Sequence, residues 1–343
     1  MRYRSLGSSG ASVSVAALGT MTFGKESSPQ ESWEQLDHYV AAGGNLLDTA
    51  DSYGAGTSEE IVGEWLARVG SAVRDDLVVA TKGRFPTGSG PNGVGLSRKH
   101  LAAALDASLC RLQVDTIDLY QTHAWDPWTP PEETLEFLTA AVRAGKVHYV
   151  GLSNVTGWQL QRLVGLSELH RLVRPVAVQP QYNLLSREVE WEILPAAAAN
   201  GLAVLPWSPL AGGWLTGKYA PDAAPTEGRL GAAPAGAMNA YARRSADRRT
   251  WDVVETVRAV AQEHDVPMAR VALAWVLSRP EVTSVVLGAR TVTHLADNLA
   301  ALELVLSAEE LARLDAASDP APADYPYGEL GREQRTRRLQ GGR

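Results

Sequence analysis

The sequence predicts a (β/α)8 barrel, the TIM-barrel architecture, and three observations support this fold class. Eight short apolar runs of the kind that form buried parallel strands are separated by longer stretches with helical periodicity. Several of these stretches begin with a capping box, as at Ser28 with Glu31 and at Ser307 with Glu310. No G-x-G-x-x-G turn follows the first run, which disfavours the main alternative, a doubly wound open sheet.

The predicted elements alternate along the chain, after an N-terminal β-hairpin in residues 1–15 that would cover one end of the barrel. The strands are predicted at residues 16–18, 45–47, 77–80, 117–120, 149–152, 176–178, 202–205 and 282–287. The helices are predicted at residues 30–42, 58–69, 98–112, 132–144, 156–172, 187–199, 250–264, 267–278 and 292–302.

We expect residues 1–343 to form a single barrel domain with extra helices and loops at its C-terminal face. Residues 83–97 are a Gly-rich loop, and residues 211–247 form the longest loop, interpreted as a lid or a binding loop. Residues 320–343 are predicted to be a flexible tail.

The amino-acid composition and the net charge disfavour several classes of protein. A hydrophobic fraction of 45% is typical of a soluble globular chain, and a net charge of −7 disfavours general nucleic-acid binding. A single cysteine, Cys110, is expected to be a buried core thiol in a reducing compartment. No apolar run reaches the ~18 residues of a membrane span, and the N-terminus lacks the apolar core of a signal peptide. We therefore expect a cytoplasmic protein without membrane contact.

Four polar residues that follow successive strands fit one reaction. Asp48 and Tyr53 follow the second strand, Lys82 the third and His123 the fourth. In a barrel these strand ends meet on one face, where catalytic residues collect. A tyrosine with a pKa near 10 is a weak acid at neutral pH, but a nearby ammonium stabilises its phenolate. The set therefore predicts Tyr53 as a tuned general acid and His123 as the group that orients a carbonyl.

Protonating a carbonyl oxygen is half of a reduction, so the hydride must come from a cofactor. Asn154 and Gln179 offer amides that match a nicotinamide carboxamide, and Trp207 offers a ring for stacking. No cluster of His, Cys and Glu has the spacing of a metal site, so no metal is expected. Asp51 is interpreted as a loop carboxylate on the other side of the turn from Asp48.

The chain resembles the aldo-keto reductase superfamily from about Leu6 to Leu314. The motifs that carry the resemblance are Leu18–Met21, Asp48–Gly54, Thr81–Gly83, Gln121–His123, Gly151–Asn154, Gln179–Asn183, Trp207–Leu210 and Gly288–Asn298. The segment Trp125–Trp128 resembles the branch that includes bacterial sugar- and aldehyde-active members and the potassium-channel β subunits.

By this resemblance, Asp48, Tyr53, Lys82 and His123 form a catalytic tetrad with Tyr53 as proton donor, and the cofactor is NADP(H). The residues implied in cofactor binding are Gly19, Thr20, Met21, Asp48, Ser153, Asn154, Gln179, Trp207, Ser208, Pro209, Leu210, Gly212, Lys218, Arg229, Gly288, Arg290, His294, Asp297 and Asn298. Arg290, at the start of the last predicted helix, is expected to meet a 2′-phosphate, which favours NADPH over NADH. The candidate walls of the substrate pocket are Phe23, Tyr53, His123, Trp125, Trp128 and Trp214.

Three functions stay open on the sequence. The leading one is NADPH-dependent reduction of a small-molecule aldehyde or ketone. The second is a cofactor-binding regulatory subunit whose turnover is incidental. The third is a barrel aldolase or isomerase that uses Lys82 as a Schiff base, which the motif Gly288–Asn298 disfavours because such enzymes need no dinucleotide. Monomer and homo-oligomer both remain open.

Overall fold

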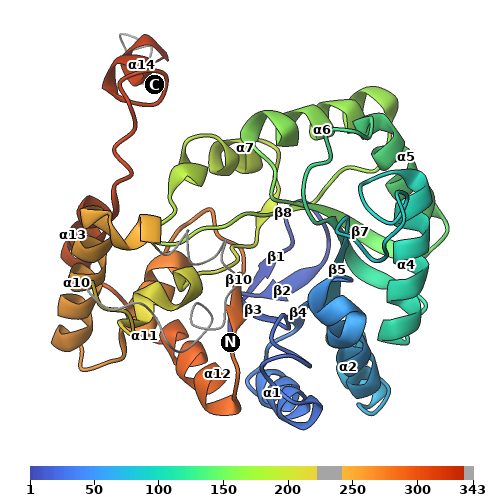
Figure 1. The fold of residues 1–343 in the computed structure, drawn as a ribbon, viewed down its shortest axis with the longest axis horizontal. Helices are drawn as coiled ribbons and strands as arrows, with labels where there is room; N and C mark the ends of the chain where they lie inside the picture. Colours follow the sequence, from blue (N-terminus) through green and yellow to red (C-terminus); the bar gives the residue numbers. More distant parts are fainter. Residues whose placement is uncertain (222–241, 336–343) are drawn as a thin grey trace.

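At the centre of the computed structural model, a parallel sheet of eight strands is ringed by helices (Figure 1). The structure describes residues 1–221 and 242–335. In spatial order the strands of the sheet are β10 (Val285–Gly288), β3 (Ala16–Gly19), β4 (Leu46–Asp48), β5 (Val78–Gly83), β6 (Ile117–Thr122), β7 (Val147–Ser153), β8 (Ala177–Gln179) and β9 (Ala203–Val204).

The sheet closes on itself. The backbone N–H of Thr283 donates to the carbonyl oxygen of Val204 at 2.8 Å, and that of Val286 donates to the carbonyl oxygen of Pro206 at 2.9 Å. These bonds join the β9 side of the sheet to the β10 side, and neighbouring strands from β10 through β3 to β9 pair in parallel. The predicted (β/α)8 barrel is therefore confirmed.

The helices lie outside the sheet, and most of them bury an apolar face against the barrel (Figure 1). They are α1 (Pro29–Ala41), α2 (Thr57–Leu66), α3 (Ser71–Asp76), α4 (Arg98–Leu112), α5 (Pro131–Arg143), α6 (Gly157–His170), α7 (Ile193–Ala199), α10 (Arg248–Glu263), α11 (Met268–Leu277), α12 (Val292–Leu299), α13 (Ala308–Ser318) and α14 (Glu329–Arg335). Short 3-10 segments are η1 (Tyr53–Gly56), η2 (Glu188–Glu190), η3 (Ala211–Thr216) and η4 (Ala300–Leu302).

One predicted helix is divided in two. Residues 187–199 form η2 and then α7, which begins at Ile193. Pro195 explains the break, because proline lacks the N–H that a helix interior requires and is tolerated in the first turn. The helix therefore restarts shortly before Pro195.

The N-terminal hairpin forms as predicted and closes one end of the barrel. Strand β1 (Tyr3–Ser5) pairs antiparallel with β2 (Ser12–Ser14), and Leu6 and Val13 are buried with the side chains of the barrel interior. The turn requires glycine at Gly7, since its φ is +58° and a Cβ there would lie 2.2 Å from the carbonyl oxygen of Val176. A side-chain hydrogen bond from Arg4 to the carbonyl oxygen of Val282 ties the hairpin to the segment before β10.

The prediction of a buried Cys110 is wrong, because this thiol is exposed on α4. The buried face of α4 carries Leu101, Leu105 and Leu112, which recur at helical spacing, and Cys110 lies off that face.

In the predicted tail, α14 lies apart from the barrel (Figure 1), and the ring of Tyr327 stacks on Trp191 at 5.3 Å. Within the described part of the chain, no helix combines the length and the apolar character that crossing a membrane requires.

Candidate active site

The four tetrad candidates come together at the C-terminal ends of β4, β5 and β6. The Lys82 ammonium donates to the Asp48 carboxylate (Nζ to Oδ2, 2.7 Å), to the carbonyl oxygen of Thr49 (2.8 Å) and to the Tyr53 hydroxyl (3.2 Å). These bonds match the three donors of an ammonium group. The Lys82 and Asp48 side chains are only 1% and 5% exposed, so this ion pair is buried.

The local sequence explains how these side chains reach the barrel mouth. Leu46 and Leu47 are buried in β4, so its first polar side chain, Asp48, comes where the strand ends. The chain then turns through η1, where Gly54 has a φ of +58° and Ala55 a φ of +55°. This turn presents the Tyr53 ring with its centroid 4.9 Å from the Lys82 nitrogen.

Lys82 stays a cation in this site. Burial alone lowers the pKa of a lysine, but the charges of Asp48 and Tyr53 outweigh it, and the pKa of Lys82 is raised. The second Asp48 oxygen, Oδ1, accepts from the side-chain amides of Gln179 at 2.7 Å and Gln121 at 3.4 Å. Gln179, expected to clamp a nicotinamide, thus donates to the carboxylate that holds Lys82.

His123 is a neutral imidazole at ordinary pH. Burial, followed by the positive charges of Lys82 and Arg84, lowers the pKa of His123 to about 3. Its ring lies edge-on to Tyr53 at 5.8 Å and to Phe85 at 4.6 Å between centroids. Among the described residues its Nδ1 atom has no hydrogen-bond partner. A neutral ring with one N–H can donate to a carbonyl oxygen without carrying a charge into the site.

A cavity of about 1050 Å³ runs from the tetrad to the start of α12. That is at the upper end of the range for small-molecule and cofactor sites. The predicted residues that line it are Gly19, Met21, Asp48, Tyr53, His123, Ser153, Asn154, Gln179, Trp207, Ser208, Pro209, Leu210, Gly212, Lys218, Gly288, Arg290, His294, Asp297 and Asn298. Thr20 is buried behind this wall, with its hydroxyl 2.7 Å from the Ser58 hydroxyl. Arg229 lies outside the described residues.

Near the tetrad, the cavity wall is held rigidly by side-chain hydrogen bonds. The Trp207 indole N–H donates to the Asn154 side-chain oxygen at 3.1 Å, and the Asn154 amide donates to the carbonyl oxygen of His123 at 2.9 Å. Ser153 donates to the carbonyl oxygen of Gln179 at 2.9 Å. Trp207 and His123 are therefore linked through one asparagine, on the side of the cavity where a nicotinamide would stack.

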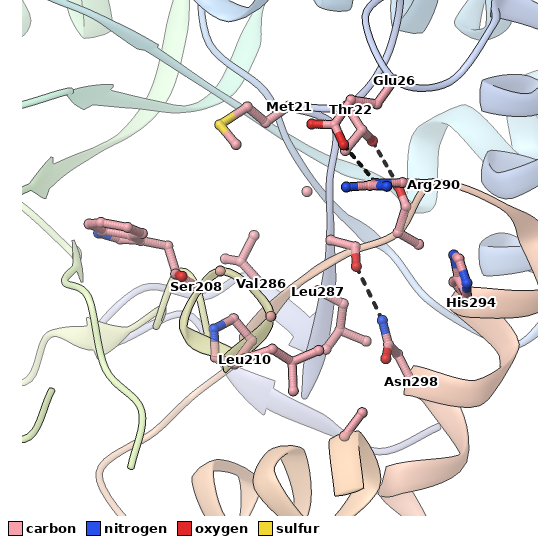
Figure 2. A pocket seen from close by; sticks show the side chains of 18 of the residues that line it. Met21, Thr22, Glu26, Ser208, Leu210, Val286, Leu287, Arg290, His294 and Asn298 are labelled. Carbon is pink, nitrogen blue, oxygen red and sulfur yellow. Dashed lines mark hydrogen bonds and ion pairs between the residues drawn. The ribbon is translucent and has the colours of Figure 1, made fainter. Parts of the chain in front are cut away.

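The far end of the cavity has the chemistry of an anion site. Arg290 brings positive charge to this end, where α12 begins with Thr291 as its N-cap, and Lys218 lines the same cavity. The N-terminus of a helix carries free N–H groups and favours negative charge. Figure 2 shows Arg290, His294 and Asn298 on this side, with Asn298 donating to the carbonyl oxygen of Gly288 at 3.2 Å. This end of the cavity therefore offers positive charge and free backbone N–H groups to an anionic ligand.

Four of the six substrate-pocket candidates do not line the cavity. Phe23 is fully buried in the core outside the barrel, and Trp214 packs edge-on against Tyr219 and Trp251. Trp125 packs against Trp158. Trp128 is 91% exposed, because the Asp126 carboxylate accepts its backbone N–H at 3.0 Å and turns the chain outward.

Two residues that the sequence did not single out, Phe85 and Glu26, also line the cavity. Phe85, beside His123, belongs to the Gly-rich loop of residues 83–97. An aromatic residue so soon after Lys82 was the signal available. Glu26 lies in the loop after β3 and forms an ion pair with Arg290. A lone charge in a loop offers no such signal.

Asp51 is more unusual than the loop carboxylate that was predicted. It is 2% exposed, and neither of its carboxylate oxygens has a hydrogen-bond partner among the described residues. Burial, followed by the negative charge of Glu59, raises the pKa of Asp51 to about 7.

Comparison with known proteins agrees with this geometry. Residues 17–319 match the Aldo/keto reductase family. An uncharacterised oxidoreductase of Bacillus subtilis is 38% identical over 92% of this chain and 95% of its own length. A probable voltage-gated potassium channel subunit beta of Oryza sativa is 37% identical over 94% of this chain and 98% of its own.

An L-glyceraldehyde 3-phosphate reductase of Escherichia coli is 35% identical over 92% of this chain and 92% of its own length. A family match that spans most of the chain, with relatives this similar over nearly their whole lengths, settles the classification. The chain belongs to the aldo/keto reductase family and is an NAD(P)H-dependent oxidoreductase that acts on carbonyl compounds.

Proposed function

We propose that this protein reduces an aldehyde or ketone to an alcohol with NADPH, and that Tyr53 is the general acid. The observation that carries the proposal is the partly buried hydrogen bond from the Lys82 ammonium to the Tyr53 hydroxyl, 3.2 Å long, at the edge of the cavity. Bound NADPH would supply a hydride to the carbonyl carbon.

The residues of this chain have separate roles in the proposed reaction. Tyr53 gives its hydroxyl proton to the substrate oxygen, and Lys82 stabilises the phenolate that remains. Asp48 keeps Lys82 charged and in place through the 2.7 Å ion pair. His123, neutral because its pKa is lowered to about 3, donates a hydrogen bond to the substrate oxygen and orients it.

Residues along the cavity would hold the cofactor. Asn154 and Trp207 lie on the side of the tetrad and suit the nicotinamide, while Lys218 and the N-terminus of α12 suit the phosphates. Arg290 suits a 2′-phosphate, because its guanidinium lies at the same end as α12. This placement supports NADPH as the preferred cofactor.

The Schiff-base alternative is disfavoured by the state of Lys82. A lysine nucleophile must be neutral, but the pKa of Lys82 is raised and its ammonium donates to Asp48, Thr49 and Tyr53. The regulatory alternative keeps one observation in its favour, the similarity to a rice protein described as a probable potassium channel subunit.

The test measures NADPH oxidation at 340 nm against a panel of aldehydes and ketones, for the wild type and for Tyr53→Phe. We expect Tyr53→Phe to lose about 10²- to 10⁴-fold in kcat while its affinity for NADPH, measured by fluorescence, is kept. Tyr325→Phe, at a tyrosine that is 67% exposed, is the matched control and should react like the wild type.

Two results would count against the proposal. If both proteins bind NADPH and neither reduces any carbonyl compound, the regulatory function replaces the enzymatic one. If Tyr53→Phe keeps the rate of the wild type, another group is the acid.

A further inference from the structure

The adenosine end of the cavity holds a carboxylate beside its guanidinium. Arg290 Nε lies 2.7 Å from Glu26 Oε2, and both residues line the cavity. Figure 2 shows the two side chains facing each other across the gap between the loop after β3 and the start of α12. The side chains are 41% and 25% exposed, so an incoming ligand can reach the pair.

The loop that carries Glu26 is fastened to the segment that carries Arg290. The Ser27 hydroxyl and the Gln35 amide donate to the carbonyl oxygen of Arg290 at 2.8 and 3.2 Å. The Thr22 hydroxyl donates to the carbonyl oxygen of the preceding residue, Ala289, at 2.8 Å. Ser27 and Gln35 are buried, so these bonds form a fixed frame. The position of Glu26 is therefore part of the architecture of the cavity.

A carboxylate and a 2′-phosphate compete for the same partner. A phosphate monoester carries about −1.5 to −2 charges at neutral pH and seeks the guanidinium that Glu26 already contacts. Binding the phosphate there must break or share the Glu26–Arg290 pair and bring two anions close together. A 2′-hydroxyl carries no charge and can instead donate a hydrogen bond to the carboxylate.

We propose that Glu26 is a cofactor-specificity residue, which opposes the 2′-phosphate by occupying Arg290 and so narrows the preference for NADPH over NADH. This inference rests on the proposed function, because it presumes that adenosine binds beside α12. Arg290 attracts the 2′-phosphate, and the negative charge of Glu26 weakens this attraction. The difference between the two effects sets the relative affinities for NADPH and NADH.

The test is a pair of adenine nucleotides that differ only in the 2′-phosphate. The affinities of adenosine 2′,5′-bisphosphate and of 5′-AMP are measured by calorimetry for the wild type and for Glu26→Gln. We expect Glu26→Gln to increase the ratio of the two affinities by roughly three- to tenfold, through tighter binding of the bisphosphate. The ratio of the dissociation constant of NADPH to that of NADH should fall by a similar factor.

A matched control separates this local effect from net charge. Glu34→Gln removes one negative charge from α1, where Glu34 accepts a hydrogen bond from Gln30, and it should leave the ratio unchanged. An unchanged or reduced ratio in Glu26→Gln would overturn the inference, since a reduced ratio means that Glu26 serves to hold Arg290 ready for the phosphate. The thermal unfolding midpoint of each variant confirms that it is folded.

The two proposals fail in different ways. If the wild type oxidises NADPH with a carbonyl substrate and Glu26→Gln shows no change in selectivity, only the role of Glu26 is overturned. If neither nucleotide nor either dinucleotide binds to any of the proteins, the proposed function is overturned and this inference falls with it.

Discussion

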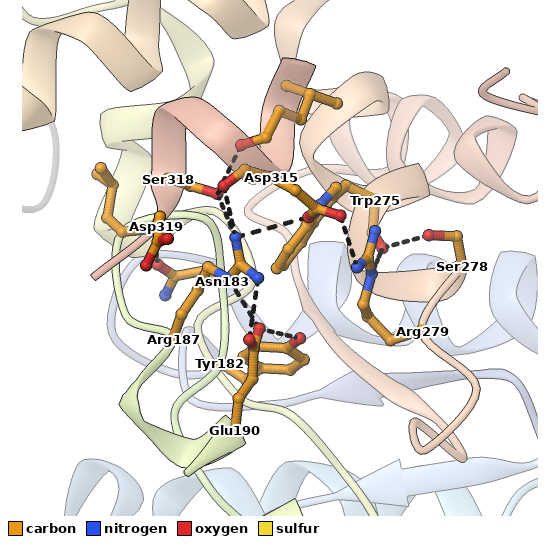
Figure 3. Close-up of polar contacts among 12 residues, drawn as sticks. Tyr182, Asn183, Arg187, Glu190, Trp275, Ser278, Arg279, Asp315, Ser318 and Asp319 are labelled. Atoms are coloured by element: carbon orange, nitrogen blue, oxygen red, sulfur yellow. Dashed lines mark hydrogen bonds and ion pairs between the residues drawn. The ribbon is translucent and has the colours of Figure 1, made fainter. Parts of the chain in front are cut away.

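Two clusters in this molecule each have a cationic side chain that donates to a carboxylate and is near a tyrosine. Only one of the clusters reaches the cavity. The Lys82 cluster (Asp48, Thr49, Tyr53, Lys82 and Gln179) lies at the mouth of the barrel. The Arg187 cluster (Tyr182, Arg187, Glu190, Trp275, Arg279, Asp315 and Ser318) joins the loop after β8 to α11 and α13 (Figure 3).

In the Arg187 cluster, hydrogen bonds run from protein group to protein group. Arg187 contacts both carboxylate oxygens of Glu190, at 2.7 and 2.9 Å, and donates to the Ser318 hydroxyl at 2.9 Å. The Asp315 carboxylate accepts from the Trp275 indole at 2.8 Å and from Arg279 at 3.2 Å. No member of this cluster lines the described cavity.

The Lys82 cluster instead ends at the cavity. Asp48, Tyr53 and Gln179 line it, and so does the neighbouring His123, whose Nδ1 has no partner among the described residues. The Lys82–Asp48 pair is nearly fully buried, whereas the Glu190 and Asp315 side chains of the Arg187 cluster are 28% and 35% exposed. The two clusters also differ in access to a ligand. We therefore expect mutations in the Lys82 cluster to change the rate and mutations in the Arg187 cluster to change stability.

The largest expected effect is at Lys82. Lys82→Met removes the charge that stabilises the Tyr53 phenolate, and we expect kcat to fall about 10²- to 10⁴-fold. Initial rates at saturating NADPH and substrate measure this. Lys146→Met, at a lysine in an exposed ion pair with Asp106, is the control with the same chemical change. If Lys82→Met keeps a tenth or more of the wild-type kcat, the Lys82 cluster is not the catalytic cluster that we propose.

The second effect is at Arg187. Arg187→Met leaves Glu190 without its cation, while Asp315 keeps Arg279 at 3.2 Å. Glu190 and Asp315 are partly exposed, so we expect a loss of about 1–3 kcal/mol in stability. Thermal unfolding should show this as a midpoint lower by a few degrees, while kcat stays within a factor of two or so. Arg248→Met, at an arginine that is 93% exposed, should show neither change. A large fall in kcat with an unaltered midpoint would show that this cluster serves catalysis and contributes little to stability.

The third effect concerns the buried carboxyl of Asp51, which lies near the Lys82 cluster without belonging to it. Its pKa is raised to about 7 in the folded protein, against about 3.9 in an unfolded chain. The folded state therefore holds a proton that the unfolded chain has lost, so this group lowers stability as the pH rises from about 4 to about 7.

Asp51→Asn should remove that dependence. We expect the variant to unfold at a midpoint several degrees above that of the wild type at pH 8, at a midpoint moderately above it at pH 5, and at nearly the same midpoint at about pH 4. Differential scanning fluorimetry across this range measures the difference. A variant that is less stable than the wild type at pH 8 would show that the carboxylate is held in its charged form.

The smallest effect is at an exposed pair. Arg98 and Glu136 lie 2.6 Å apart, with side chains that are 57% and 56% exposed. Because water screens both charges, Glu136→Gln should cost less than about 1 kcal/mol, seen as a small midpoint shift that 0.5 M salt reduces further. A loss as large as that of Arg187→Met would mean that distance, rather than burial, sets the strength of these pairs.

The sequence was enough to predict the barrel and the meeting of the four tetrad residues. Strands buried on both faces are apolar, so Leu46 and Leu47 predict β4, and parallel strands bring their polar ends to one edge. The extent of β5 was harder to predict, because it continues through Thr81 and Lys82, whose polar side chains find partners in Glu59 and Asp48.

The walls of the cavity were beyond such reasoning. The direction of a loop side chain depends on distant contacts, which is why Trp128 points to solvent while Phe85 packs on His123. Glu26 and Arg290 are 264 positions apart, and no local sequence pattern predicts that they form an ion pair. Gln179 carries a suitable amide, but only the structure shows that the amide donates to Asp48.

The hairpin that closes the barrel has a consequence for how the protein is made. Arg4 bonds to Val282, a residue 278 positions later, so this contact can form only after the ribosome has added those residues. At about 5–20 residues per second, that wait is roughly 14–56 s. Leu6 and Val13 are apolar and bury only in the finished barrel, so the nascent chain carries them uncovered throughout. We therefore expect the hairpin to need protection by chaperones until the segment around Val282 has been made.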